Sequence, residues 1–157
     1  MSDERVFVLK RASLFGSIGL ALVFFLAGSG LLAAKLSPAA AKLADITIFA
    51  FGDIGRANHP SEGELRFREV LWGENALPSF REILQRGTPA AKAYALCGIR
   101  LLAPGEFEAV AKSATKVDVA VRTVSGCIPR VKKFSALVAE IQNGNFDAFL
   151  EKDRKLP

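Results

Sequence analysis

The longest apolar segment of the chain lies close to its amino terminus. Residues 12–34, ASLFGSIGLALVFFLAGSGLLAA, are 23 residues without a charged side chain. As an α-helix this segment would extend over about 34 Å, enough to cross a hydrocarbon core of about 30 Å. Lys10 and Arg11 directly precede it, and a basic flank before the first apolar segment favours retention of the amino terminus in the cytoplasm. We therefore expect residues 1–11 to form a basic cytoplasmic terminus and residues 12–34 a transmembrane anchor.

A cleaved signal peptide is the alternative interpretation of the same segment. Signal peptides have a shorter apolar region, of about 7–15 residues, followed by a small-residue cleavage site. The best such pattern here, Ala39 and Ala41, lies several residues beyond the apolar segment, and Asp3 and Glu4 dilute the basic start. We favour the uncleaved anchor, and both interpretations place the rest of the chain outside the cytoplasm.

The charge of the chain indicates no nucleic-acid partner. The formal net charge is +5, and the residues after position 34 carry 18 Lys and Arg against 14 Asp and Glu. These charges are scattered, whereas nucleic-acid binders show a basic stripe or interleaved aromatic platforms. The nearest thing to a basic run, PRVKK at residues 129–133, is interpreted as a solvated surface. A domain next to a bilayer can also be attracted to anionic lipid headgroups, so the bilayer is an expected partner.

Capping residues and apolar spacing predict four short helices between residues 61 and 112. Ser61 and Glu64 have the spacing of a capping box, in which Glu64 would reach back to the Ser61 amide. Thr88 and Pro89 predict the start of a nearly wholly apolar helix that ends before Pro104, so we expect it to be the central helix. Short connections favour antiparallel helical hairpins.

The sequence predicts two extended segments. Val117, Val119 and Val121 alternate with other residues, which predicts a strand. An isolated strand is unstable, and ITIF at residues 46–49 is its only obvious partner. The predicted fold class is therefore mainly α: an N-terminal transmembrane helix, a tether over residues 35–45, and an irregular bundle of helical hairpins with one or two extended segments over residues 46–157.

The two cysteines, Cys97 and Cys127, predict a disulfide if the domain lies outside the cytoplasm. Such a bond would stabilise the fold by about 3–4 kcal/mol in the chain-entropy model. Two buried free thiols are the alternative. A reactive nucleophile is the least favoured interpretation, because Cys97 lies in mid-helix among apolar residues, far from a helix N-terminus.

The segment from Gly52 to Glu64 contains the only candidates for polar chemistry. His59, the single histidine, could act as a base or join Asp53, Glu62 and Glu64 around a metal. Structural zinc sites use several Cys or His ligands, and acidic side chains in the first turn of a helix would repel a phosphate. We therefore predict no catalytic residue, no cofactor and no metal, and keep these four residues as loop candidates.

Three stretches carry a resemblance to known proteins: SEGELRFREVL at 61–71, RGTPAAKAYALCGIRLL at 86–102 and TVSGCI at 123–128. They resemble uncharacterised small membrane-anchored proteins of the bacterial envelope, and the hairpins of residues 61–112 are similar to HEAT-type repeats. The resemblance implies a periplasmic helical domain held at the inner membrane by a single span. It carries over no functional residue.

The expected function is that of an accessory or scaffolding subunit, which acts by protein–protein interaction within a larger membrane or envelope complex. This expectation follows from a well-specified fold with no convergent polar site. Two other classes stay open. One is an envelope enzyme that uses His59 with Asp53 or Glu62, and the other is a small lipid or pigment carrier with phenylalanines lining a cavity.

Overall fold

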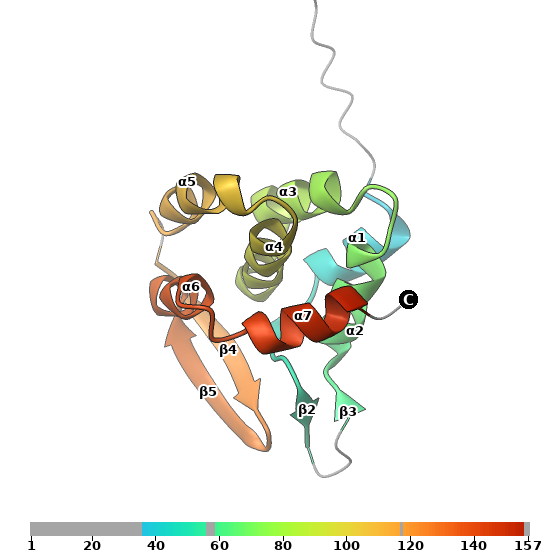
Figure 1. Ribbon diagram of the computed structural model, residues 1–157. Coiled ribbons are helices and arrows are strands. Elements are labelled where there is room, and N and C mark those ends of the chain that lie inside the picture. The colour runs from blue at the N-terminus through green and yellow to red at the C-terminus, as the bar shows by residue number, and fades with distance from the viewer. Residues whose placement is uncertain (1–35, 56–58, 117, 156–157) are drawn as a thin grey trace, which may run out of the picture. The chain divides into compact units, whose positions relative to one another are not determined.

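The computed structural model describes residues 36–55, 59–116 and 118–155 (Figure 1). Within these residues it contains seven helices and five short strands, so the mainly helical class is confirmed. The helices are α1 (Pro38–Ala44), α2 (Glu62–Leu71), α3 (Ala76–Arg86), α4 (Pro89–Leu102), α5 (Pro104–Ala114), α6 (Phe134–Gln142) and α7 (Asp147–Lys155). The strands are β1 (Ile48–Phe49), β2 (Asp53–Ile54), β3 (His59–Pro60), β4 (Ala120–Ser125) and β5 (Ile128–Lys133).

Helix α4 is the central helix, as its apolar composition predicts. It starts where expected, because the Thr88 hydroxyl accepts a hydrogen bond from the Ala91 N–H at 3.1 Å. Helices α3, α5 and α6 lie around it (Figure 1). Gly98 allows the close approach of α3, since a Cβ atom at this position would lie 2.4 Å from the Phe80 ring. The apolar surface of α4 is thus buried against neighbouring helices on several sides.

An aromatic cluster joins the first extended segment to the helices. The Tyr94 ring on α4 lies with its centroid 4.7 Å from that of Phe49 and 5.1 Å from that of Phe51. Phe51 also contacts Phe67 of α2 and Phe149 of α7. Burial of such large rings is a main source of core stability, so segments from both halves of the domain are needed to complete this core.

Strand β4 lies in the middle of a three-stranded sheet with the order β1-β4-β5. Strand β1 pairs with it in parallel, Ile48 opposite Arg122, which confirms the pairing predicted for residues 46–49. Strand β5 pairs with β4 in the antiparallel sense along its whole length. Residues 129–133, predicted as a solvated surface, are mostly exposed as expected, and the structure adds that they belong to an edge strand. Gly126, with φ 58°, allows the tight connection between the two strands.

The predicted tether over residues 35–45 contains a short helix. Residues 38–44 form α1, in which the Ala40 and Leu43 side chains are completely buried against the bundle. The Ser37 hydroxyl caps this helix by accepting from the Ala40 N–H. The chain therefore becomes part of the core several residues before the predicted domain start at residue 46.

The predicted membrane anchor, residues 12–34, and the basic terminus before it lie outside the described residues. Among the helices that the structure does describe, none is long and apolar enough to cross a bilayer.

Candidate functional site

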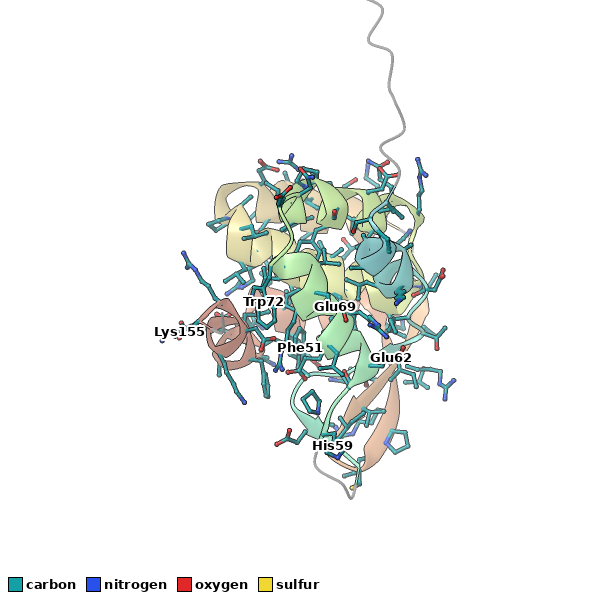
Figure 2. The ribbon with its side chains drawn as sticks, turned by 90° about the vertical axis from the view of Figure 1, so that its right-hand side faces the viewer. Phe51, His59, Glu62, Glu69, Trp72 and Lys155 are labelled. Carbon is teal, nitrogen blue, oxygen red and sulfur yellow. The ribbon has the colours of Figure 1, made fainter. Side chains whose placement is uncertain are left out.

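The four loop candidates do not converge on one site. His59 is exposed and pairs with Ile54 in the two-stranded ribbon of β2 and β3. Glu62 is exposed on the outer side of α2, and Figure 2 shows it well separated from His59. Asp53 lies in β2 opposite Pro60. Only Glu64 is buried, with 2% of its surface exposed. The described residues contain no group of three or more His, Cys, Asp and Glu side chains that could hold a metal ion.

Glu64 belongs to a buried ionic network that the sequence did not indicate. Its carboxylate accepts a hydrogen bond from the Gly52 N–H at 2.7 Å and pairs with the Arg68 guanidinium one turn later on α2. Arg68 also donates through Nε to Asp153 Oδ1 of α7 at 2.7 Å. The Trp72 indole N–H donates to the Asp153 carbonyl at 3.0 Å, beside the end of α7 (Figure 2). These bonds fasten α7 onto α2.

The geometry corrects one detail of the predicted helix cap. Ser61 does cap α2, because its hydroxyl accepts from the Glu64 N–H at 3.0 Å. The Glu64 side chain, however, turns to Gly52 and Arg68 and leaves the reciprocal half of the capping box unmade. In this arrangement each carboxylate oxygen of Glu64 has a partner, since Oε1 accepts from the Arg68 guanidinium and Oε2 accepts from the Gly52 N–H.

Burial dominates the electrostatics of this network. The pKa of Glu64 is raised by desolvation, which outweighs the opposing effects of the Gly52 N–H and the Arg68 charge. The pKa of Asp153 is raised for the same reason, again against Arg68. Its Oδ2 atom has no hydrogen-bond partner among the described residues. A raised carboxyl pKa can mark a catalytic acid, but here both carboxylates are occupied by the cation that crosslinks two helices.

A cleft of about 250 Å³ lies over the network and is lined by Asp53, Glu64, Arg68 and Lys152. It brings together two of the loop candidates, Asp53 and Glu64. His59 and Glu62 do not line it, so no imidazole stands beside the buried carboxylate. General acid–base catalysis needs a donor and acceptor within hydrogen-bond reach of a substrate. The charged residues of this cleft are better explained as structural ion pairs that hold α7 against α2.

A second buried polar group surrounds the Tyr94 hydroxyl. The Tyr94 hydroxyl donates a hydrogen bond to the Ala50 carbonyl and accepts one from the Ala50 N–H at 2.9 Å. The Ser61 hydroxyl oxygen lies 3.2 Å from the Tyr94 hydroxyl oxygen. Burial raises the pKa of Tyr94 well above its ordinary value. The phenol therefore stays neutral and serves to satisfy the main chain where the first extended segment crosses the core.

The predicted disulfide between Cys97 and Cys127 is not supported, because both thiols are free. Cys97 is completely buried in the middle of α4, whereas Cys127 is exposed at the connection between β4 and β5. The central helix is surrounded by its neighbours, and the hairpin presents its tip to solvent. Desolvation strongly raises the pKa of the Cys97 thiol, so it is a poor nucleophile.

The large apolar side chains with the highest exposed fractions lie instead on the sheet. Val131 and Ile128 of β5 are 70% and 56% exposed, more than any other large hydrophobic side chain in the described residues. One face of the sheet, with Val121 and Thr123, is buried toward α4 and α6. The opposite side, which we name the outer face, is not covered by any helix in Figure 1. The outer face consists of Ile48, Ala120, Arg122, Val124, Pro129, Val131 and Lys133.

Strand β5 is an edge of this sheet, and the described residues provide no further strand beyond it. The Phe134 N–H donates to the Val119 carbonyl at 2.8 Å, so the adjacent pair of Ala120 and Lys133 is a non-hydrogen-bonded pair. Every second residue of β5, counted back from Lys133, therefore directs its main-chain groups away from β4. These residues are Pro129, Val131 and Lys133.

The edge and the outer face carry positive charge. A shallow cavity of about 220 Å³ along these strands is lined by Ile48, Val124, Val131 and Arg122 of the outer face, together with Arg130 of the edge strand, and by no acidic residue. Neither arginine has an ion-pair partner among the residues that the structure describes. The sequence contained a signal for this strand that was missed: Ser125-Gly126 is a turn pattern that separates a valine-rich segment from a segment with Ile128 and Val131.

The chain matches no protein-family model, no curated protein and no solved structure. The resemblance to HEAT-like envelope proteins therefore stays a prediction.

Proposed function

We propose that this protein is a membrane-anchored accessory or scaffolding subunit whose described domain binds an acidic, extended segment of a partner protein along β5. The observation that supports this is the uncovered edge of β5, where outward-facing main-chain groups lie beside exposed Val131 and two unpaired arginines. Strand addition to a free edge draws affinity from main-chain hydrogen bonds and specificity from alternate side chains. The proposed anchor, residues 12–34, would hold this edge near an inner membrane on its periplasmic side.

The charge of the edge favours an acidic partner over a second copy of the chain. Two β5 edges paired in the antiparallel sense would bring Arg130, Lys132 and Lys133 of each copy together, and like charges on paired strands are destabilising. Pro129 also removes one outward N–H, which blunts indiscriminate pairing. An acidic strand paired with β5 would instead be attracted by Arg130, Lys132 and Lys133.

A peptide experiment with the full chain in phosphatidylcholine nanodiscs tests this proposal. A synthetic peptide of alternating glutamate and threonine should slow hydrogen exchange in residues 128–133, while a peptide of alternating lysine and threonine should not. Val131→Pro removes an N–H that makes no bond to β4, so it should abolish this protection and leave the fold intact. Unchanged protection in Val131→Pro would show that the edge is not the binding site.

The charge requirement is tested separately. Arg122→Glu should weaken binding of the glutamate peptide about tenfold or more, whereas Lys112→Glu, an exposed change on α5 outside the sheet, should have little effect. Native sizing after gentle detergent extraction then asks whether the chain travels in a larger assembly that Val131→Pro disrupts. Migration of the wild-type chain alone would contradict the scaffolding role.

A further inference from the structure

A second cavity of the described domain lies among α3, α4, α5 and the start of α6, and it is not used by the proposed docking. It has a volume of about 510 Å³, within the range of about 300–1,000 Å³ that is typical of small-molecule sites. Its walls come from the end of α3, the start of α4, the end of α5, and the residues that flank the sheet at Val119 and Phe134. The lining residues are Leu84, Gln85, Pro89, Lys92, Val110, Ser113, Ala114, Val119 and Phe134.

The cavity wall is mostly apolar and contains a single charge. Leu84, Val110 and Phe134 offer hydrocarbon surface from three different helices, while Lys92 is the only charged residue in the lining. Lys92 is half-buried, and its ammonium group makes no hydrogen bond or ion pair with any residue that the structure describes. A half-buried lysine without an ionic partner would gain an attractive interaction from an anion bound beside it.

The start of α4 strengthens the positive potential at this position. Lys92 lies in the first two turns of the helix, near its positive end, and the first turn contains no acidic residue. A lysine close to a helix N-terminus is electrostatically unfavourable unless an anion is near. The apolar wall and the unpaired cation are independent features, and they select the same ligand: one that is hydrocarbon along most of its length and anionic at one end.

We infer that this cavity binds a long-chain aliphatic carboxylate, with the hydrocarbon chain against Leu84, Val110 and Phe134 and the carboxylate paired with Lys92. The site is separate from the β5 edge, so it does not depend on the proposed docking function. It makes the domain a receptor for free fatty acids at the membrane surface.

Photolabelling of the full chain in phosphatidylcholine nanodiscs tests the inference, because it separates binding in the cavity from partition into the bilayer. The probe is a saturated fatty acid with a diazirine on its chain, and labelled peptides are located by mass spectrometry. We expect labels within residues 84–92 and 110–119, removed by an excess of unlabelled palmitate. A fatty alcohol with the same chain and diazirine should label these residues at least tenfold less.

Two variants and one control make the result decisive. Lys92→Gln should reduce labelling of the cavity residues by tenfold or more, and Lys112→Gln, an exposed lysine of α5 outside the lining, should not. Ala114→Phe fills the cavity and should also reduce labelling, with circular dichroism used to confirm that each variant is folded. Labels confined to other residues, equal labelling by the alcohol, or undiminished labelling of Lys92→Gln would each overturn the inference.

Discussion

Replacing Arg68 with alanine should destabilise the protein by about 3–5 kcal/mol near neutral pH. This guanidinium is the shared partner of Glu64 and Asp153, whose side chains are only 2% and 1% exposed. Removing one member of a buried ionic group leaves the others charged and unpaired, and such changes typically cost about 3–5 kcal/mol. Urea unfolding measures the effect, and Trp72, the only tryptophan, reports it because its indole N–H is bonded to the end of α7.

The loss of stability in Arg68→Ala should become smaller as the pH is lowered. The pKa values of Glu64 and Asp153 are both raised in the folded state by burial. The folded carboxyl groups therefore hold their protons to a higher pH than those of the unfolded chain, whose pKa values lie near about 4. Their contribution to stability is full below that value and is lost as the pH rises through the folded pKa. Without Arg68 both pKa values rise further, so the deficit of the variant should shrink as the pH is lowered from 7.

Arg81→Ala is the matched control for this prediction. Arg81 pairs with Glu106 at 2.6 Å, but the two side chains are 46% and 49% exposed. Exposed ion pairs contribute about 0–1 kcal/mol, so this variant should remain close to wild type at every pH. If Arg68→Ala costs no more than Arg81→Ala, or if its deficit is the same at pH 5 and pH 7, burial does not govern the network as argued.

Three further outcomes test other parts of the structure. Without a reductant, maleimide should label Cys127 in the folded chain and reach Cys97 only after denaturation; protection of both thiols in the denatured, unreduced chain would show that they are bonded after all. Gly98→Ala should cost about 1–3 kcal/mol in urea unfolding, since the new methyl group overlaps the buried Phe80 ring, and a neutral result would mean that α3 can move away. Tyr94→Phe should cost about 1–3 kcal/mol by leaving the Ala50 N–H in the core without a partner, while the Ala50 carbonyl keeps its bond from the Ser61 hydroxyl, and a more stable variant would contradict the role assigned to the Tyr94 hydroxyl.

The helical part of the fold was predictable because its signals are local. Ser61 and Thr88 cap helices that begin where their side chains indicate, and the composition of α4 correctly places it at the centre. The pairing of β1 with β4 was also predicted, by elimination, because a lone strand needs a partner, whereas its parallel sense was not predicted. These inferences required only propensity, capping and apolar spacing.

The rest depends on contacts between distant residues, which local patterns do not reveal. Nothing near Glu64 in the sequence indicates that Asp153 will share its cation, so a loop candidate proved to be part of a fastening between helices. Strand β5 was missed because Arg130, Lys132 and Lys133 suggested a solvated surface, although charged side chains are common on edge strands. The even number of cysteines indicated a bond, but only the packing around Cys97 shows why it stays apart from Cys127.

The attachment of α7 has a consequence for how the chain is made. During synthesis residues emerge from the amino end, so Phe51 and Arg68 leave the ribosome or a translocation channel long before α7 does. Until then Phe51 lacks the Phe149 ring and Arg68 lacks Asp153. A chain cut short before α7 would keep an open aromatic core and an incomplete charge network, a state that chaperones and proteases recognise. Closure of the aromatic core therefore has to wait until residues 147–155 have been synthesised.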